Sequence, residues 1–334
     1  MRAPEFWEHR KGGTFSAALS PLGWAYGLGG RARRAATRAW RAPVPVLCVG
    51  NAVAGGAGKT PLALDIGERL RGRGVDAHFL TRGYGGAAAG PLRVDAARHT
   101  FADVGDEALL LAEVAPTWVA RHRAAGARAA VAAGADALVM DDGHQNPALA
   151  KDVSLLAVDG GYGFGNGCIM PAGPLREPLS DALRRADAVV LMGGDATGVT
   201  GEIAQIGRRA GTSLPILAAN ARPGPEGRGL AAKPVVAFAG IGRPGKFFET
   251  LGAAGAEVAA TLPFPDHHPY GAGDIERLEN LAEAHGAALV TTAKDAVRLP
   301  ETLRARVAVL TITLEWEDEA AIEAILDTLV SHGR

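Results

Sequence analysis

Short apolar runs alternate with segments of helical periodicity over most of the first two thirds of the chain. Leu62, Ile66 and Leu70, for example, fall on one face of a helix. The runs that we expect to be strands are 46–49, 75–80, 137–140, 153–159 and 188–192. Strands that alternate with helices predict an α/β fold, with a mainly parallel sheet covered on both faces.

A second, smaller α/β unit is expected after a break in this pattern. Residues 221–234 are rich in Gly, Pro and Arg and have little periodicity, which is typical of a linker. The expected strands beyond the linker are 235–239, 288–292 and 307–310, followed by a terminal amphipathic helix. We therefore divide the chain into residues 1–41, a main domain 42–220, the linker 221–234 and a smaller domain 235–334.

Residues 1–41 have a different composition, with aromatic and apolar side chains interleaved with arginines, five of which lie in 31–41. This mixture suits a helical segment that docks on a membrane surface, where rings lie at headgroup depth and arginines meet anionic lipid. The alternative is a helix packed on the core with a solvated basic face. No run reaches about 18 consecutive apolar residues, so no membrane-spanning helix is predicted. The charged N-terminus is unlike a secretory signal. The residues concerned are Phe6, Trp7, Leu19, Leu22, Trp24, Tyr26, Leu28, Arg31, Arg33, Arg34, Arg38, Trp40 and Arg41.

Net charge and cysteine content say little about the partners of the protein or its cellular compartment. The net charge of -1 over 334 residues gives no overall attraction to nucleic acid, so none is expected as a partner. Cys48 and Cys168 are the two cysteines, and they do not suggest a disulfide framework. A reducing cytosol is therefore the expected compartment.

The candidate chemistry begins directly after the first expected strand. Gly55-Gly56-Ala57-Gly58-Lys59-Thr60 joins that strand to a helix, as in a phosphate-binding loop, although Val53 stands at the position of the first motif glycine. Glycines let backbone N–H groups close around phosphate oxygens. Lys59 is expected to reach the outer phosphates, and the Thr60 hydroxyl to hold Mg²⁺.

Acidic residues follow at the ends of other expected strands. The run 137–140 leads into Asp141 and Asp142, which is the form of a second metal-site element in phosphate-loop enzymes. Asp106 opens a helical stretch, where a carboxylate is also an ordinary partner of the helix dipole. Because ligands bind at the carboxyl ends of parallel strands, we expect these acids and Lys59 to converge there.

These motifs together resemble the tetraacyldisaccharide 4'-kinase family, the lipid A biosynthetic kinases of Gram-negative bacteria. The resemblance covers nearly the whole chain, in family order, and its proline-rich and His-His blocks are highly specific. The matching blocks are 49–51, 55–61, 81–85, 105–107, 141–145, Pro171-Ala172-Gly173-Pro174-Leu175-Arg176-Glu177-Pro178-Leu179, 239–242, Phe264-Pro265-Asp266-His267-His268-Pro269-Tyr270 and 294–297.

The resemblance implies an activity, a compartment and partners. A member transfers the γ-phosphoryl group of ATP, with Mg²⁺, to the 4'-hydroxyl of an acylated glucosamine disaccharide 1-phosphate. Because the acceptor is a lipid, the resemblance also favours membrane docking by residues 1–41. We then expect a peripheral protein that contacts surface lipids on the cytoplasmic face of the bacterial inner membrane. No obligate protein partner is evident.

The resemblance also implies roles for individual residues. Asp106 is similar to the family's catalytic acid, which accepts the hydroxyl proton, and His267 to its partner from the second domain. Residue patterns alone leave His268 as a competing choice. Further contacts to nucleotide, phosphate or metal are expected from Arg82, Glu107, Arg176 and Glu177, the last two acting as a charged pair stiffened by flanking prolines.

Three positions depart from the family pattern. His144 stands where an aromatic is usual, Asn146 where a histidine is usual, and Ala293 where Glu is frequent. We expect His144 to be a surface or loop-packing residue.

Two other readings of the chain are weighed against the kinase. One is a phosphate-loop GTPase or metallochaperone-type regulator, but Lys294 comes one position too late for the guanine motif and no metal-delivery tract is present. The other is a membrane-binding protein with a decayed nucleotide fold. Intact site residues argue against decay, namely Lys59, Thr60, Asp106, Asp141 and Asp142.

Overall fold

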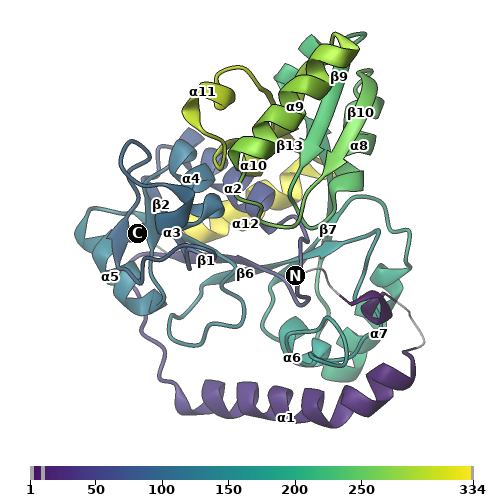
Figure 1. Cartoon of the computed structure of the whole chain (residues 1–334). Coiled ribbons are helices and arrows are strands. Elements are labelled where there is room, and N and C mark those ends of the chain that lie inside the picture. Colours follow the sequence, from purple (N-terminus) through teal and green to yellow (C-terminus); the bar gives the residue numbers. More distant parts are fainter. Residues whose placement is uncertain (1–3, 9–11, 332–334) are drawn as a thin grey trace.

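The computed structural model describes residues 4–8 and 12–331, and it contains two sheets (Figure 1). The large sheet is parallel except at its two edge pairs, β13–β8 and β4–β3. Its strands, in spatial order, are β13 (Ile312–Trp316), β8 (Ile216–Pro223), β7 (Ala188–Met192), β6 (Val153–Asp159), β1 (Val46–Gly50), β5 (Ala137–Asp141), β2 (Ala77–Thr81), β4 (Thr117–Val119) and β3 (Leu92–Arg93). The predicted α/β fold is thus present, and all five strands expected before residue 200 exist.

Helices cover both faces of the large sheet, and its central strand β1 is therefore buried on both sides. Leu47 and Val49 face one core, with α2 and α12, whereas Val46 and Cys48 face another, with α5. The helices around this sheet are α2 (Lys59–Gly72), α3 (Phe101–Val104), α4 (Asp106–Val114), α5 (Arg123–Ala132), α6 (Leu179–Leu183), α7 (Val199–Ala210) and α12 (Glu319–Ser331).

The small sheet is entirely parallel and has the order β10-β9-β11-β12. Helices α8 and α9 pack on its opposite faces, through Phe247 and Leu251 on one side and Leu278 on the other. Its elements are η2 (Pro225–Leu230), β9 (Pro234–Ala239), α8 (Pro244–Ala253), β10 (Glu257–Pro263), α9 (Ala272–His285), β11 (Ala288–Thr292), α10 (Ala293–Ala296), α11 (Glu301–Arg304) and β12 (Ala308–Leu310).

The last segment of the chain returns to the large sheet. Strand β13 pairs antiparallel with β8, and Ile322, Leu326 and Leu329 of α12 are buried in the core beneath that sheet. The sequence had placed these residues in the smaller domain 235–334. The structure also has β8 running to Pro223 and η2 beyond it, where 221–234 was expected to lack regular structure.

Helix α1 (Thr14–Ala36) lies along one end of the molecule, at the bottom of Figure 1, and η1 (Glu5–Trp7) precedes it. Its buried residues are small, namely Ser16, Gly23 and Gly27. A side chain at Gly23 would meet the carbonyl oxygen of Ile169 at 2.7 Å, so the helix packs very closely there. Within the described part of the chain, no helix is both long and apolar enough to cross a bilayer.

Candidate active site

The glycine-rich loop after β1 has the backbone that a phosphate cradle requires. Gly55 and Gly58 have φ of 120° and 81°, and Gly58 caps the N-terminus of α2. Lys59 follows, 9% exposed, with its Nζ 3.4 Å from the Gly55 carbonyl oxygen and 3.8 Å from Asp142 Oδ1. Burial lowers the pKa of Lys59, and the Asp142 charge opposes that shift. The lysine therefore folds over the loop where phosphates would bind.

The two aspartates at the end of β5 have different surroundings. Neither oxygen of Asp141 has a hydrogen-bond partner among the described residues, and burial, with Glu107 and Asp142 nearby, raises its pKa to about 7. Asp142 has a φ of 50° and an ion pair of 2.8 Å with Arg176. Although burial opposes it, the charges of Lys59 and Arg176 hold the pKa of Asp142 low. Of these two aspartates, Asp141 is therefore the one that is fully buried and has no ion pair with the described residues.

This arrangement suits Mg²⁺ bound partly by the protein and partly by phosphate and water. Asp141 and the buried hydroxyl of Thr60 offer oxygen ligands, and Thr60 Oγ1 lies 3.5 Å from Glu107 Oε1. Among the described residues, no group of three or more His, Cys, Asp or Glu side chains forms a complete metal cage. Mg²⁺ does not require one, because it keeps several waters and binds substrate phosphates.

Asp106 and His267 meet across the two sheets. His267 Nδ1 lies 3.0 Å from Asp106 Oδ2, and the backbone N–H of Glu107 donates to Asp106 Oδ1 over 2.8 Å. Burial raises the pKa of Asp106, but the hydrogen bond with His267 and the nearby cations outweigh it, so the net shift is downward. The same hydrogen bond raises the pKa of His267. The pair thus favours an ionised carboxylate beside a protonated imidazole.

The neighbouring histidine faces away from this carboxylate. His268 Nε2 contacts Asp274 at 2.8 Å, and its ring stacks on Phe264 with centroids 4.9 Å apart. His267 instead has a φ of 96°, an unusual value for a residue with a side chain. The tight backbone there turns the His267 ring toward Asp106. The geometry therefore selects His267 over His268 for the predicted partnership.

Comparisons with known proteins now bear on the identity of this site. Residues 15–331 match the family model described as Tetraacyldisaccharide-1-P 4'-kinase. Proteins named tetraacyldisaccharide 4'-kinase are similar over their whole length. The one from Gluconacetobacter diazotrophicus is 55% identical over 98% of both chains, and the one from Rhodospirillum centenum is 54% identical over 100% of this chain and 99% of its own.

The chain belongs to the tetraacyldisaccharide-1-P 4'-kinase family. A solved structure of LpxK from Aquifex aeolicus, described as an apo form in complex with ATP, has a TM-score of 0.77 to it. The two are 24% identical, and the match covers 95% of this chain and 100% of the other. The predicted family, the kinase class and the fold are confirmed.

Two basic residues of this family member's site were missed by the sequence analysis. Lys294 Nζ contacts Glu107 Oε1 at 2.6 Å, and Arg298 Nη2 lies 3.1 Å from Asp106 Oδ2. Lys294 lies in a block that resembles the family (294–297), but Arg298 lies just beyond it. The charge of Glu107 helps to hold the pKa of Lys294 high although burial opposes it. Lys294 is thus paired in the kinase site, not placed as a guanine-recognition lysine.

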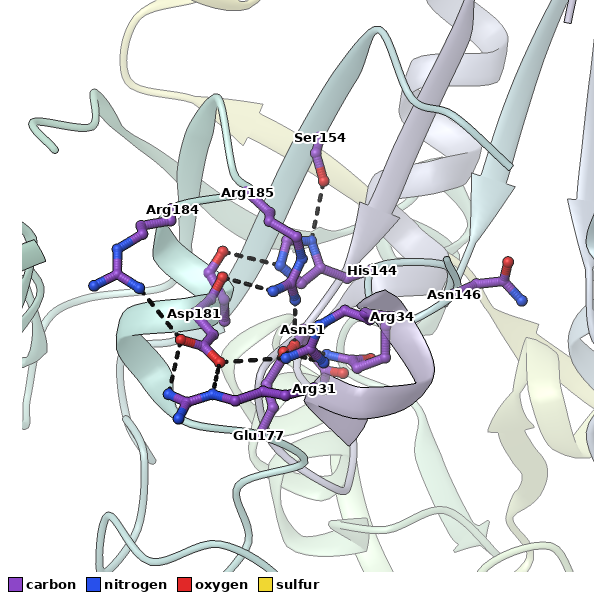
Figure 2. A network of polar contacts seen from close by, with 12 residues as sticks. Arg31, Arg34, Asn51, His144, Asn146, Ser154, Glu177, Asp181, Arg184 and Arg185 are labelled. Atoms are coloured by element: carbon purple, nitrogen blue, oxygen red, sulfur yellow. Dashed lines mark hydrogen bonds and ion pairs between the residues drawn. The ribbon is translucent and has the colours of Figure 1, made fainter. Parts of the chain in front are cut away.

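Arg176 and Glu177 do not act as a pair. Arg176 points to Asp142, whereas the buried Glu177 accepts from Arg185 at 2.6 Å and lies 3.0 Å from Arg34 of α1. Figure 2 shows Glu177 within the network that joins α1 to α6. The expectation that both side chains contact phosphate or metal therefore fits the position of Arg176 and not the observed contacts of Glu177.

Arg82 and His144 are the two remaining positions that the sequence singled out. Arg82, directly after β2, is exposed. His144 is buried, between Ser154 Oγ and the carbonyl oxygen of Ala182, each at 3.0 Å. Burial lowers its pKa to about 3, so the ring is neutral. Its Nε2–H donates to the carbonyl and Nδ1 accepts from Ser154, a packing role in place of the usual aromatic.

Proposed function

We propose that this protein transfers the γ-phosphoryl group of ATP to the 4'-hydroxyl of a tetraacylated glucosamine disaccharide 1-phosphate. The observation that carries the proposal is the meeting of Asp106 and His267 at the carboxyl end of the sheet that also bears the phosphate loop. Membership of the family supports the same acceptor and the same product, the bis-phosphorylated lipid A precursor.

The proposed division of labour follows from the contacts in the site. The loop amides and Lys59 hold the ATP phosphates, and Thr60 with Asp141 holds Mg²⁺. Bound Mg²⁺ supplies positive charge that offsets the phosphate oxygens. Asp106 accepts the proton of the 4'-hydroxyl as the new P–O bond forms. His267 holds the Asp106 carboxylate in its orientation. When the His267 imidazole is protonated, its charge also keeps that carboxylate ionised.

A transfer assay tests this proposal. Purified protein in detergent is mixed with γ-labelled ATP, Mg²⁺ and the tetraacyldisaccharide 1-phosphate, and the lipid product is located by mass spectrometry and phosphorus NMR. The label should appear on the 4'-oxygen of the lipid. Absence of labelled lipid, together with GTP hydrolysis stimulated by a protein partner, would instead support the regulator alternative.

We further propose that α1 docks the enzyme on the cytoplasmic face of the inner membrane. Its support is a set of large apolar side chains that α1 exposes, namely Phe15, Leu22, Trp24, Tyr26 and Leu28. The predicted role of the arginines needs revision, because three of the five are already paired with protein acids. Arg31 and Arg34 contact Asp181, and Arg41 contacts Asp152. The apolar face therefore carries most of the proposed membrane affinity.

Vesicle co-sedimentation tests the docking proposal. The triple variant Phe15→Ser, Trp24→Ser, Leu28→Ser should lose at least about tenfold in binding to anionic vesicles, because each side chain contributes roughly 1.5–3 kcal/mol when buried in lipid. The matched control is Ala18→Ser with Ala25→Ser, two exposed positions of the same helix. Equal binding by both proteins would remove α1 as the docking element.

A further inference from the structure

We propose that Arg298 is a positioning residue that holds the Asp106 carboxylate in the orientation needed to receive the acceptor proton. This inference rests on the proposed function, since it assigns a purpose to Arg298 only if Asp106 acts as the base. Arg298 belongs to the small sheet's domain, two residues past α10, and Asp106 is the first residue of α4 beside the large sheet.

The guanidinium of Arg298 is fixed by its own neighbours. Its Nε donates to the Lys294 carbonyl oxygen over 3.0 Å, and its Nη1 to the Gly240 carbonyl oxygen over 3.1 Å. Nη1 also lies 3.4 Å from Asp295 Oδ1. The side chain is only 1% exposed. An arginine held along one edge of its planar fork presents the remaining nitrogen in one direction.

Asp295, which anchors this fork, is itself held by three hydrogen bonds to its carboxylate. Its Oδ1 accepts from Tyr270 Oη at 2.6 Å and from the Gly240 N–H at 2.8 Å, and its Oδ2 accepts from Thr292 Oγ1 at 2.6 Å. The carboxylate is fully buried. A fully satisfied buried network of this kind rigidifies its surroundings, which favours the observed orientation of Arg298.

The free nitrogen, Nη2, is directed at the proposed base. It lies 3.1 Å from Asp106 Oδ2, the same oxygen that His267 contacts, and it makes no hydrogen bond with the described residues. The Asp106 side chain is 2% exposed. A buried donor that lacks a hydrogen bond is costly, and its position beside a carboxylate indicates that its charge serves that carboxylate.

The donors around Asp106 leave a definite place for the acceptor hydroxyl. A carboxylate has about four lone-pair sites. His267 and the Arg298 charge lie at Oδ2, and the Glu107 N–H takes one site on Oδ1. The open lone pair on Oδ1 is where a sugar hydroxyl can donate. Arg298 thus keeps Oδ2 turned inward and Oδ1 turned to the substrate.

The charges around Asp106 define how this role can be measured. The charged side chains that act on Asp106 include His267 from the loop after β10, Lys294 of α10 and Arg298 itself, while the Glu107 carboxylate of α4 is neutralised by Lys294. Removing the Arg298 charge should raise the apparent pKa of the Asp106–His267 pair, because a cation that favours the ionised carboxylate is lost. In the profile of kcat/KM against pH, activity falls on the acidic side as the base becomes protonated. This acidic limb then moves to higher pH.

The experiment measures lipid phosphorylation against pH for the full-length protein and two neutral variants, Arg298→Met and Arg298→Gln. We expect kcat to fall by about 10²-fold, with the KM for ATP changed less than about threefold, and the acidic limb to shift upward by about one pH unit. Arg298→Lys, which retains the charge, should return the limb to within about half a unit of wild type. Arg306→Met, which removes an exposed ion pair with Glu279 in the same domain, is the matched control.

Each outcome decides the matter. If wild type itself does not phosphorylate the lipid, the proposed function fails. If wild type is active and a folded neutral variant, judged by its thermal unfolding and ATP affinity, keeps the wild-type limb, Arg298 has only a structural role and the inference is overturned. If Arg298→Met does not fold, Arg298→Gln, which retains an N–H donor toward Gly240, decides in the same way.

Discussion

At the scale of single residues, the two adjacent aspartates of β5 differ in the charges that they meet. Asp142 is paired with Arg176 and lies near Lys59, whereas the Asp141 oxygens have no partner in the described chain. A fold that buries an unpaired carboxylate gives up stability unless a cation binds there. This contrast supports Asp141 as the Mg²⁺ ligand and Asp142 as the residue that orders Arg176 and Lys59.

Asp141→Asn should stabilise the metal-free protein at alkaline pH. Because folding raises the pKa of Asp141 to about 7, the folded state disfavours the charged form, and this penalty grows as pH rises from about 4 past 7. In EDTA, the thermal midpoint of Asp141→Asn should exceed that of wild type by at least about 2 °C at pH 8 and match it near pH 4.

The control for that measurement is the neighbouring residue. Asp142→Asn should lower the midpoint at pH 8, because it leaves Arg176 and the buried Lys59 without their acid. An Asp141→Asn protein that is less stable than wild type at pH 8 in EDTA would contradict the account of an unpaired buried charge.

Some site residues were predictable from sequence and others were not. The phosphate loop and the acids after β5 are local patterns, since glycines, a Lys-Thr pair and a strand end are adjacent in the chain. Arg298 and Asp106 are far apart in the sequence. Nothing in the residues around Arg298 distinguishes this arginine from one on the surface. The split of Arg176 from Glu177 was also hidden, because sequence shows neighbouring charges but not their partners.

At the scale of elements, α1 is attached by charge and by close packing rather than by a large apolar face. Arg31 and Arg34 contact Asp181 of α6, and Arg34 also contacts Glu177, just before that helix (Figure 2). Small residues let the helix approach the loop around Ile169. The apolar side chains of α1 consequently remain on its outer side, which composition alone did not reveal.

Arg34→Met should weaken the attachment of α1 and destabilise the protein. It leaves the buried carboxylate of Glu177 with Arg185 as its only cation among the described residues, at a cost of about 2–3 kcal/mol in the free energy of unfolding. Urea denaturation measures this loss. Arg33→Met, at an exposed position of the same helix turn, should stay within about 0.5 kcal/mol of wild type. Equal stabilities of the two variants would refute the attachment role of Arg34.

At the scale of the whole molecule, the site is assembled from two sheets that touch through ionised side chains. His267, Lys294 and Arg298 from the small-sheet side meet the two acids that open α4, and Arg243 and Lys246 of the same side contact Asp159 at the end of β6. Neither set of residues forms a complete site alone. Asp106, the proposed base beside the large sheet, therefore receives its charged neighbours His267 and Arg298 from the small-sheet side.

The contact between the sheets should depend on pH through His267. Its folded pKa is raised by Asp106, so its contribution to stability is fully present below its unfolded pKa of about 6.5 and is lost as pH rises through the elevated folded value. His267→Gln should therefore lower the thermal midpoint at about pH 6 and have a smaller effect at about pH 9. A deficit that is the same at both pH values would show that the charge of His267 is not involved.

The overall topology was only partly predictable. The alternation of strands and helices indicates a parallel sheet, but the return of β13 and α12 to the large sheet is a long-range pairing with no local signature. For the same reason, the sequence alone assigned the terminal helix to the smaller domain. The alternation of strands and helices does predict where Lys59, Asp106 and Asp141 converge, namely at the carboxyl ends of the parallel strands.

The most direct test of the account is the turnover of Asp106→Asn beside wild type. Transfer of labelled phosphate from ATP to the tetraacyldisaccharide 1-phosphate is measured at saturating substrates, with ATP affinity determined in parallel as a check on folding. A base that accepts the hydroxyl proton contributes about 10²–10⁴-fold, so kcat should fall by at least about 10²-fold while ATP still binds. A variant that turns over within about twofold of wild type would contradict the assignment of Asp106 and the site built around it.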